Sequence, residues 1–200
     1  VTIDGDHGGT FSSLKLTNES DAPRELLDGF GDDVTYWADT GDVYGASFGN
    51  VITRESDVSA ELTVLASGPL IARVQAIFTL GGQQVVKIVT MRADDPLVEV
   101  ELEMSALPDS TAIAHTSTIL DADMRTDDLG FGAFNHKIDT RPIESGDVTY
   151  RREIFYPIMY WSDVSKDDVG LTLITHGLQG VSGGDQRGVM LVRQAAGDNE

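Results

Sequence analysis

The feature that most constrains the fold of this chain is a strict alternation of apolar and polar residues. In the segment Leu97 to Ser105 (LVEVELEMS), apolar side chains alternate with Glu99, Glu101 and Glu103. Successive side chains of a β-strand point to opposite faces, so the segment predicts a strand with one buried and one solvated face. Glu99 and Glu101 have a spacing that would suit a catalytic pair, but a solvated strand face is the simpler interpretation.

A β-hairpin is predicted just before this strand. The segments Leu70 to Leu80 and Gln83 to Arg92 are rich in β-branched residues and flank the dipeptide Gly81–Gly82. Two glycines between strand-like segments favour a two-residue turn with positive φ angles. The cluster Asp94 to Pro96 then predicts a turn into the Glu-rich strand.

The rest of the chain continues this pattern of short strands and turns, and no segment has a convincing helical period. Many strands without interleaved helices indicate an all-β fold, an antiparallel sandwich or barrel. With no repeat, linker or break in composition, we expect one domain over residues 1–200. Because Val1 begins directly in a strand-like segment, we expect that domain to be a piece of a longer protein. Further strands are predicted at Thr10 to Leu16, Tyr44 to Thr53, Glu61 to Ala66, Thr111 to Leu120, Ile154 to Trp161, Val169 to Ile174 and Val189 to Arg193.

The acidic balance of the chain limits its partners. Its net charge is -19, with 33 acidic residues against 14 Lys and Arg. Nucleic acids and anionic membranes are bound through basic residues, so neither is an expected partner. The excess of Asp and the scarcity of Lys favour the hypothesis of a surface adapted to high salt, the alternative being an ordinary acidic surface.

Composition also bounds location and redox chemistry. No apolar run approaches the ~20 residues needed to cross a bilayer, so a soluble protein is predicted. Residues Val1 to Gly9 lack the basic and apolar regions of a signal peptide, which leaves the compartment open, with the cytoplasm as the first expectation. The absence of cysteine excludes disulfides, thiolate metal sites and cysteine nucleophiles.

The abundance of carboxylates makes the search for a glycosidase pair unspecific, since glycoside hydrolysis needs only two of the 33 acidic residues. Glu153 stands out because apolar and aromatic residues follow it, and partial burial would shift the pKa of its carboxyl. A hydrogen bond or ion pair with Arg151 or Arg152 is the simpler interpretation of this residue.

Metal ligation has only a poor pattern. The segment DADMRTDD offers oxygen ligands of the kind that calcium prefers, from Asp121, Asp123, Asp127 and Asp128. Arg125 occupies a position at which a calcium loop supplies an oxygen, and no turn glycine follows at the required point, so no metal site is predicted.

The histidines form no recognisable catalytic or metal-binding motif, because they are far apart in the sequence. They are His7, His115, His136 and His176. His115, on a predicted strand, and His136, in a predicted loop after two aromatic residues, are the two that folding could bring to a ligand.

Two aromatic clusters have the composition of a sugar site. Sugars present apolar C–H faces and rings of hydroxyls, so their sites pair aromatic rings with polar hydrogen-bonding groups. The first cluster lies in a predicted glycine-containing loop (YWADTGDVY) and comprises Tyr36, Trp37, Asp39, Asp42 and Tyr44. The second lies in EIFYPIMYWSDVS and comprises Tyr156, Tyr160, Trp161 and Asp163. The alternative is that these aromatic side chains, Phe155, Tyr160 and Trp161 above all, fill the core.

From the second cluster onward the sequence resembles the C-terminal β-sandwich of family 38 α-mannosidases. In that family a Glu, a Pro, a stretch with Trp, Asp and Ser, a strand that starts with Gly, a turn closed by Gly and a hydrophobic strand that ends in Arg follow in this order. The corresponding segments here are Glu153 to Ser165, Gly170 to Ile174 (GLTLI), Gly177 to Gly180 and Gly188 to Arg193 (GVMLVR). The opening GGTFSSLKL with Glu25 and Leu26 is similar to the start of the same domain, and SGPLIARVQAIFTL is similar to its middle.

The resemblance implies an antiparallel supersandwich of the galactose-mutarotase-like type, placed behind a catalytic domain. In the family, an N-terminal α/β domain carries the nucleophilic Asp and the His and Asp ligands of a catalytic zinc, and none of those motifs occurs here. The resemblance therefore implies that this chain alone is inactive and that zinc belongs to the missing domain. The implied partners are that upstream catalytic domain of the same protein and a mannose-containing carbohydrate.

One departure from the family's pattern concerns a Phe-Gly turn that is closely followed by Arg and Pro. Here the segment AFNHKIDT separates Phe131 and Gly132 from Arg141 and Pro142. The candidate carbohydrate contacts are Tyr36, Trp37, Asp39, Tyr44, Phe131, Arg141, Glu153, Tyr156 and Trp161.

The expected function is therefore that of a C-terminal β-sandwich which binds carbohydrate and supports the catalytic domain of an α-mannosidase-like hydrolase. An enzymatic alternative is a free-standing mutarotase-like epimerase or lyase, with Glu153 as base and His115 or His136 as acid. A structural interaction module is a third alternative.

Overall fold

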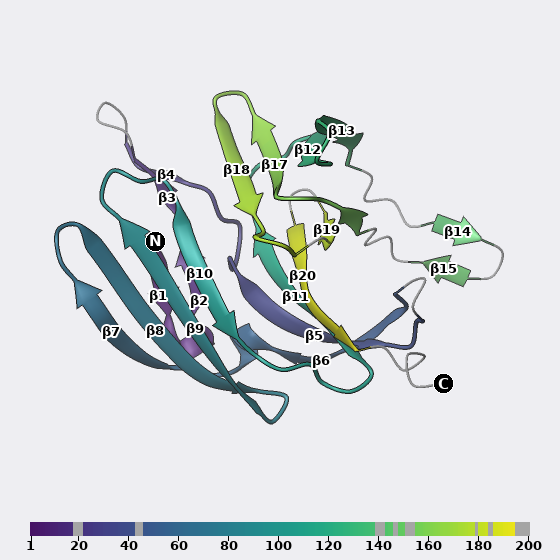
Figure 1. The fold of residues 1–200 in the computed structure, drawn as a ribbon, viewed down its shortest axis with the longest axis horizontal. Helices are drawn as coiled ribbons and strands as arrows, with labels where there is room; N and C mark the ends of the chain where they lie inside the picture. The colour runs from purple at the N-terminus through teal and green to yellow at the C-terminus, as the bar shows by residue number, and fades with distance from the viewer. Residues whose placement is uncertain are drawn as a thin grey trace. The chain divides into compact units, whose positions relative to one another are not determined.

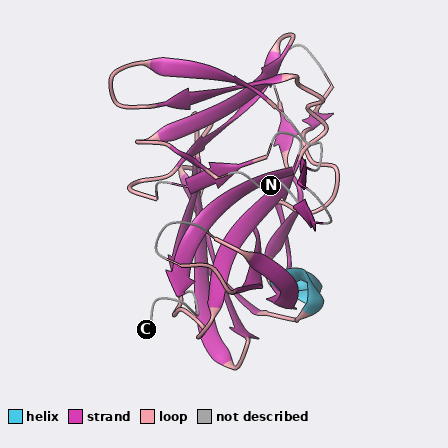
Figure 2. Ribbon diagram, turned by 90° about the vertical axis from the view of Figure 1, so that its right-hand side faces the viewer, coloured by secondary structure: helices cyan, strands magenta, loops and turns pink. Residues whose placement is uncertain are grey.

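Strands form nearly all the regular structure of the protein (Figure 2). The computed structural model describes residues 1–17, 22–42, 46–138, 143–145, 148–150, 155–178, 180–183 and 186–194, with only the backbone of 143–145, 148–150, 156 and 186. Within this part of the chain, helical structure is confined to the 3-10 turns Gly5–His7 (η1) and Glu55–Asp57 (η2), and no helix is long and apolar enough to cross a membrane. The four-stranded sheets are antiparallel throughout, so the predicted all-β antiparallel fold is confirmed.

The strands follow one another along the chain as labelled in Figure 1. Their bounds are β1 Thr2–Asp4, β2 Thr10–Ser13, β3 Lys15–Leu16, β4 Arg24–Glu25, β5 Asp33–Asp39, β6 Phe48–Arg54, β7 Glu61–Ser67, β8 Ile71–Leu80, β9 Gln83–Arg92, β10 Val98–Glu103, β11 Ser110–Ser117, β12 Met124–Asp128, β13 Ala133–Lys137, β14 Ile143–Ser145, β15 Val148–Tyr150, β16 Tyr156–Pro157, β17 Trp161–Lys166, β18 Val169–Ile174, β19 Gly180–Ser182 and β20 Gln186–Gln194.

The chain divides into two compact units that are interleaved in the sequence. Unit 1 comprises Val1–Ser13, Asp32–Ile113 and Val192–Glu200, and unit 2 comprises Leu14–Gly31 and Ala114–Leu191. Strands β11 and β20 each contribute residues to both units. A single domain over residues 1–200 stays a prediction.

Unit 1 contains the sheet β10-β9-β8-β7 (Figure 1). Strands β8 and β9 pair over their whole length and are joined by Gly81 and Gly82, with φ angles of 60° and 80°. The positive φ angle favours glycine at position 81, and a Cβ there would lie 2.4 Å from Leu107 Cδ1, so the Leu107 side chain would have to move. The predicted hairpin and its turn residues are confirmed.

Alternation gives this sheet one largely apolar face and one face on which charged, polar and apolar side chains are mixed. The buried side chains of the apolar face are Ala76, Phe78, Leu80, Val85 and Val89. On the opposite face Glu101 pairs with Arg73 at 3.1 Å, and Glu99 pairs with Arg92 at 2.7 Å. The prediction that these glutamates lie on the solvated face of a strand is therefore confirmed.

Lys87 is buried within the apolar face of this sheet. Its Nζ lies 2.5 Å from Glu55 Oε1 and 2.9 Å from Asp32 Oδ2, and it donates to the Asp32 carbonyl at 2.7 Å. Glu55 is equally buried, and its other oxygen accepts the Val34 amide at 2.9 Å. Burial acts to lower the pKa of Lys87, but the charges of Asp32 and Glu55 outweigh it and raise that pKa. Burial is the largest effect on Glu55 and raises the pKa of its carboxyl.

Unit 2 contains the sheet β13-β12-β17-β18, and strands β16, β19 and β20 also lie in this unit, apart from the end of β20. One apolar core cluster of this unit is formed by Leu26, Leu120, Val164 and Val169, against which Leu14, Ala122 and Leu171 pack. Glu25 fixes the chain that enters this core, because its Oε1 accepts the backbone amides of Leu14, Leu26 and Leu27 at 2.8, 3.2 and 3.2 Å.

Strand β5 was not expected, and the prediction that Tyr36, Trp37 and Asp39 lie in a loop is wrong. The aspartates and glycines around this segment indicated a turn. In the structure Asp33 accepts hydrogen bonds from the Ser56 amide and hydroxyl at 3.0 and 2.8 Å, and Asp39 is held by distant donors described below. Partners distant in sequence thus let acidic residues occupy a largely buried strand.

Two further expectations about strands are corrected by the structure. His136, expected in a loop, lies in β13 opposite Arg125 of β12. The predicted strand from Ile154 to Trp161 is interrupted, because β16 covers only Tyr156–Pro157 and β17 begins at Trp161. Pro157 has no backbone N–H to donate to a neighbouring strand, which is consistent with a strand of only two residues.

Substitution Lys87→Met is expected to destabilise the protein by about 3–5 kcal/mol, because it leaves Glu55 and Asp32 without the cation that compensates their burial. Urea unfolding followed by tryptophan fluorescence measures the change. Lys137→Met is the control, since Lys137 is exposed on β13. An unfolding free energy unchanged by Lys87→Met would contradict the role given to this cluster.

Candidate functional site

The sheet β13-β12-β17-β18 of unit 2 carries polar side chains on both faces. Buried residues alternate with partly exposed ones from Arg125 to Asp128 on β12 and from Trp161 to Val164 on β17. We call the buried side the inner face, with Arg125, Asp127, His136, Ser162 and Val164. We call the other side the outer face, with Thr126, Asp128, Asn135, Trp161, Asp163 and Thr172.

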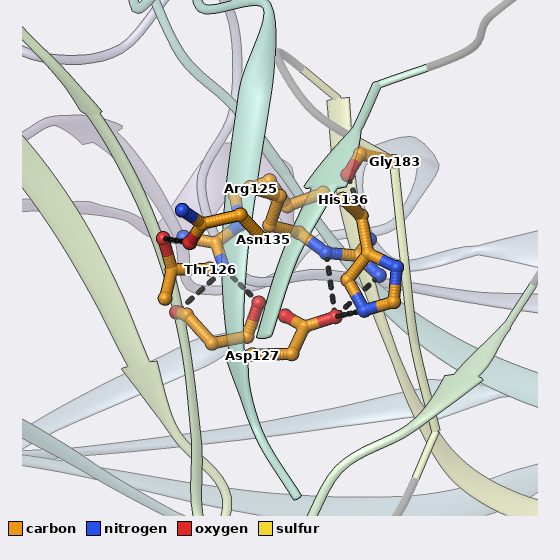
Figure 3. A network of polar contacts seen from close by, with 8 residues as sticks. Arg125, Thr126, Asp127, Asn135, His136 and Gly183 are labelled. Atoms are coloured by element: carbon orange, nitrogen blue, oxygen red, sulfur yellow. Dashed lines mark hydrogen bonds and ion pairs between the residues drawn. The ribbon is translucent and has the colours of Figure 1, made fainter. Parts of the chain in front are cut away.

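Asp127 is the centre of a polar network on the inner face (Figure 3). Its Oδ2 accepts hydrogen bonds from Arg125 Nε at 3.0 Å and Nη2 at 2.8 Å, and His136 Nε2 lies 3.3 Å from the same oxygen. Arg125 Nη1 donates to the Gly183 carbonyl at 2.9 Å, which ties β12 to the segment between β19 and β20. The ring of Phe134 packs edge-on against His136, with centroids 4.7 Å apart.

Arg187, on β20, is a second buried guanidinium in this unit. Its Nη2 donates to the Ser162 carbonyl at 2.6 Å and to the Ser162 hydroxyl at 2.8 Å, and its Nη1 donates to the Leu171 carbonyl. Burial, followed by the charge of Arg125, lowers the pKa of Arg187 to about 10. The group therefore stays charged at neutral pH and joins β20 to both strands of the β17–β18 hairpin.

The inner face can fix the sheet but is poorly suited to acid-base chemistry. Asp127 is fully buried and accepts two hydrogen bonds from Arg125, so it has little freedom to move a proton. In the segment DADMRTDD, which was considered for calcium ligation, the group that contacts the Asp127 carboxylate is the Arg125 guanidinium. Among the described residues, no group of three or more His, Asp or Glu side chains could hold a metal ion.

The outer face has a different chemistry. Asn135, Thr126, Asp163 and Thr172 stand opposite one another on the four adjacent strands and form one polar row. The Thr126 hydroxyl bonds with Asn135 Oδ1 at 2.9 Å, and Thr172 donates to Asp163 Oδ1 at 2.6 Å. Trp161 lies two residues before Asp163 on the same strand and is half-buried. An aromatic ring next to a row of hydroxyl, amide and carboxylate groups is what a sugar site requires.

The turn between β12 and β13 presents Phe131 to solvent. Its side chain is fully exposed, at 106%, and two glycines with positive φ angles, Gly130 and Gly132, stand on either side of it. The turn is held at its base, because Asp128 Oδ1 accepts the Gly130 amide at 2.9 Å and the Asp128 carbonyl accepts the Met159 amide at 2.8 Å.

In unit 1, Asp39 at the end of β5 accepts four hydrogen bonds. Its Oδ2 accepts from Arg193 Nε at 2.6 Å and from the Thr111 hydroxyl at 2.7 Å, and its Oδ1 accepts the Gly41 and Ser47 amides at 2.9 Å each. Burial would raise the pKa of Asp39, but these donors, with Arg193 first, outweigh it and lower the pKa to about 2. This carboxylate holds the strands together.

A comparison with protein families accounts for most of the chain. Residues 19–200 match the model of the glycosyl hydrolases family 38 C-terminal domain. The chain belongs to this family. The resemblance noted in the sequence is thereby confirmed, whereas no curated protein matches the chain.

Two solved structures share the fold of this family 38 domain. One, an α-mannosidase from Enterococcus faecalis V583, superposes with a TM-score of 0.78 at 14% identity, over 96% of this chain and 24% of that one. The other, a glycosyl hydrolase family 38 protein from Enterococcus faecalis, gives 0.73 at 14% identity, over 96% of this chain and 25% of that one. The chain thus spans about a quarter of the length of the proteins it resembles.

The structure places the sequence-predicted contacts of this family 38 domain in different surroundings. Tyr36 is fully buried and its hydroxyl donates to the Ser105 carbonyl, and Trp37 lies half-buried on the same strand. Phe131 and Trp161 lie on unit 2, the first at a turn and the second on the outer face. Tyr44, Arg141 and Glu153 lie outside the described residues, and only the backbone of Tyr156 is described.

The residues of the rival epimerase site are only partly described. His115 lies in β11, as predicted, and His136 lies beside Asp127 in β13. Their expected partner Glu153 lies outside the described residues, so this alternative stays a prediction.

Sequence reasoning missed the residues that depend on strand register. Asn135, Thr126 and Thr172 are ordinary polar residues until pairing places them in one row with Asp163. Arg187 gave no signal either, because a single Arg at the start of an apolar strand has the same appearance whether exposed or buried. Alternation of apolar and polar residues is the signal that predicts a strand, and Met124–Asp128 lacks it because its buried positions, Arg125 and Asp127, are charged.

Substitution Asp39→Asn is expected to lower stability at pH 7 by about 2 kcal/mol, because it removes the charge from hydrogen bonds to Arg193 and the backbone. Since the pKa of Asp39 is below its ordinary value of 3.8, its contribution is present above about pH 4 and is lost as the pH falls toward 2. Urea unfolding of the parent protein and of Asp39→Asn at pH 7 and pH 2.5 measures the difference in their unfolding free energies.

The two proteins should therefore differ at pH 7 and converge at low pH. A difference in unfolding free energy that is the same at both pH values would contradict the lowered pKa of Asp39. Asp168→Asn is the control, because Asp168 is exposed and its only described ion pair is with Arg24.

Proposed function

We propose that this chain is the C-terminal β-sandwich of an α-mannosidase-like glycoside hydrolase, where it supports the catalytic part of the protein and binds carbohydrate. The observation that carries the proposal is the match of residues 19–200 to the C-terminal domain model of family 38. The fold superposes on an α-mannosidase with a TM-score of 0.78 and covers about a quarter of that protein. This supports a parent protein in which a larger catalytic region accompanies the present chain.

Hydrolysis itself is assigned to that partner region. A retaining glycosidase needs two carboxyl groups free to act as nucleophile and as acid or base. Of the carboxylates at the centres of the two networks, Asp39 is held by Arg193 and three further donors, and Asp127 is held by two N–H groups of Arg125. These contacts suit a structural role, and the described residues do not provide a ligand set for zinc. We therefore assign zinc and the covalent chemistry to the rest of the parent enzyme.

The supporting role depends on the buried arginines of unit 2. Substitution Arg187→Met, made in the natural protein that carries this chain, removes the donors to Ser162 and Leu171. We expect a loss of about 3 kcal/mol or more in the stability of this domain, because the carbonyls and hydroxyl that Arg187 bonds are left buried without a donor. Hydrolysis of 4-nitrophenyl α-mannoside should decline with temperature in parallel with unfolding of the domain.

Arg24→Ala is the matched control, because Arg24 makes an exposed ion pair with Asp168 at 3.2 Å and such pairs contribute little. Undiminished hydrolysis after the domain has unfolded would contradict the supporting role.

The chain of 200 residues should show no hydrolysis of 4-nitrophenyl α-mannoside and no interconversion of mannose anomers. Addition of mannobiose should still shift amide resonances or raise its unfolding temperature, since a ligand that binds only the folded state stabilises it. Turnover by the chain alone would favour the epimerase or lyase alternative. An absence of any response to mannobiose would favour a structural interaction module.

A further inference from the structure

We propose that the outer face of the β13-β12-β17-β18 sheet is a binding surface for the extended, neutral part of a mannose-containing oligosaccharide. This proposal rests on the proposed function, and it identifies where on the domain a glycan chain binds in addition to the sugar unit that is hydrolysed. Every residue of the surface lies in unit 2 and on one sheet.

The first support is the arrangement of hydrogen-bonding groups. The row Asn135, Thr126, Asp163 and Thr172 presents an amide, two hydroxyls and a carboxylate across four neighbouring strands. Adjacent strands lie ~4.8 Å apart, so the row extends over about 14 Å. A row of this length offers successive hydrogen-bonding positions, which suits a chain of sugar units better than a single monosaccharide.

The second support is the position of the one indole on this face. Trp161 lies beside Asp163 along the strand and opposite Ile174 of β18, which is 47% exposed. The Trp161 side chain is half-buried, so packing from the sheet limits its freedom before any ligand binds. An indole offers a large apolar surface at low entropic cost, on which the C–H face of a sugar ring can pack.

The charge of the surface selects among glycans. Asp128 and Asp163 lie on the outer face together with the cation Lys137, and the protein carries a net charge of -19. Carboxylates accept hydrogen bonds from sugar hydroxyls but repel sulfated or sialylated chains. The surface therefore fits a neutral, hydroxyl-rich ligand.

The same features argue against a protein partner. The core of a protein interface is depleted in charged groups and rich in apolar and aromatic side chains. Here a carboxylate and a row of polar groups occupy the middle of the face and divide its apolar side chains, because Trp161 and Ile174 lie on one side of that row and Met124 lies on the other. The catalytic part of the parent enzyme remains the competing occupant, and the experiment separates it from a glycan.

The sheet of unit 1 supplies an internal control. Its solvated face carries a comparable row across strands, with Thr63, Gln75 and Glu101 in register, but Ile88 takes the fourth place and no aromatic residue lies on these strands' solvated face. If polar rows alone bound glycans, both sheets would do so. The proposal requires the row together with Trp161.

The test uses the natural protein that carries this chain, in native gels that contain soluble α-mannan. Trp161→Ala is expected to weaken retardation by mannan about tenfold, which corresponds to about 1.4 kcal/mol. Asp163→Asn and Thr172→Val keep the side-chain shapes while removing charge or hydroxyl, and are expected to weaken it about threefold each. The value of kcat/KM for 4-nitrophenyl α-mannoside should stay within about twofold of the parent value in all three variants.

The control is the pair Thr63→Ala and Gln75→Ala in unit 1, which should leave retardation unchanged. Full mannan affinity in Trp161→Ala and Asp163→Asn, or a parent protein that mannan does not retard, would overturn the proposal and leave the supporting role intact. A fall in kcat/KM that parallels the fall in mannan affinity would show that the face contacts the catalytic part, which also overturns it. Failure of the supporting role is distinguishable, because it appears in the Arg187→Met experiment and not here.

Discussion

The fold depends on the requirement that each buried charge be compensated by an opposite charge or by hydrogen-bonding groups. In unit 1, Lys87 is buried with Glu55, and Asp39 is buried with Arg193. In unit 2, Arg125 is buried with Asp127, and Arg187 donates to carbonyls and a hydroxyl. Removal of one member of such a group leaves the other uncompensated, at a cost of several kcal/mol. A register error in the strands that carry them would have the same effect, so we infer that these charges help to select the native pairing.

These contacts also explain how strands distant in the sequence are brought together. Asp39 and Arg193 are 154 positions apart, and Arg125 and Gly183 are 58 apart. Apolar contacts are non-directional and tolerate small shifts, whereas a bidentate guanidinium or a carboxylate with four donors does not. The apolar core supplies most of the driving force for collapse, and the charged networks fix which strands meet.

The contrast between apolar patterns, which are local in the sequence, and charged contacts between distant residues also explains which strands could be predicted from the sequence. Alternation is a local signal, and it predicted β9 at its full length, β18 at its full length and the Gly81–Gly82 turn. Strands β5 and β12 were missed because their aspartates and Arg125 break the apolar pattern, and the partners that make burial possible lie far along the chain. The family was recognisable from the order of short motifs near the C-terminal end. The candidate site on the outer face was predicted only in part. Trp161 was a candidate from the sequence, whereas Asn135, Thr126 and Thr172 come together with Asp163 only through the pairing of β13, β12, β17 and β18.

In the proposal made above, the inner face of that sheet provides stability and the outer face binds the glycan. Alternate residues of β12 and β17 point either to the Arg125 and Asp127 network or to the row with Asp163, and neighbours along a strand therefore belong to different functions. A substitution on the outer face leaves the buried hydrogen bonds of the inner face in place, because no side chain is shared between them. The inner network contributes to the stability of the sheet, whereas side chains of the outer row can be exchanged without removing any of its buried hydrogen bonds. If the outer face binds glycan as proposed, its specificity can therefore change on one side of a strand while the other side keeps the contacts that fix the sheet.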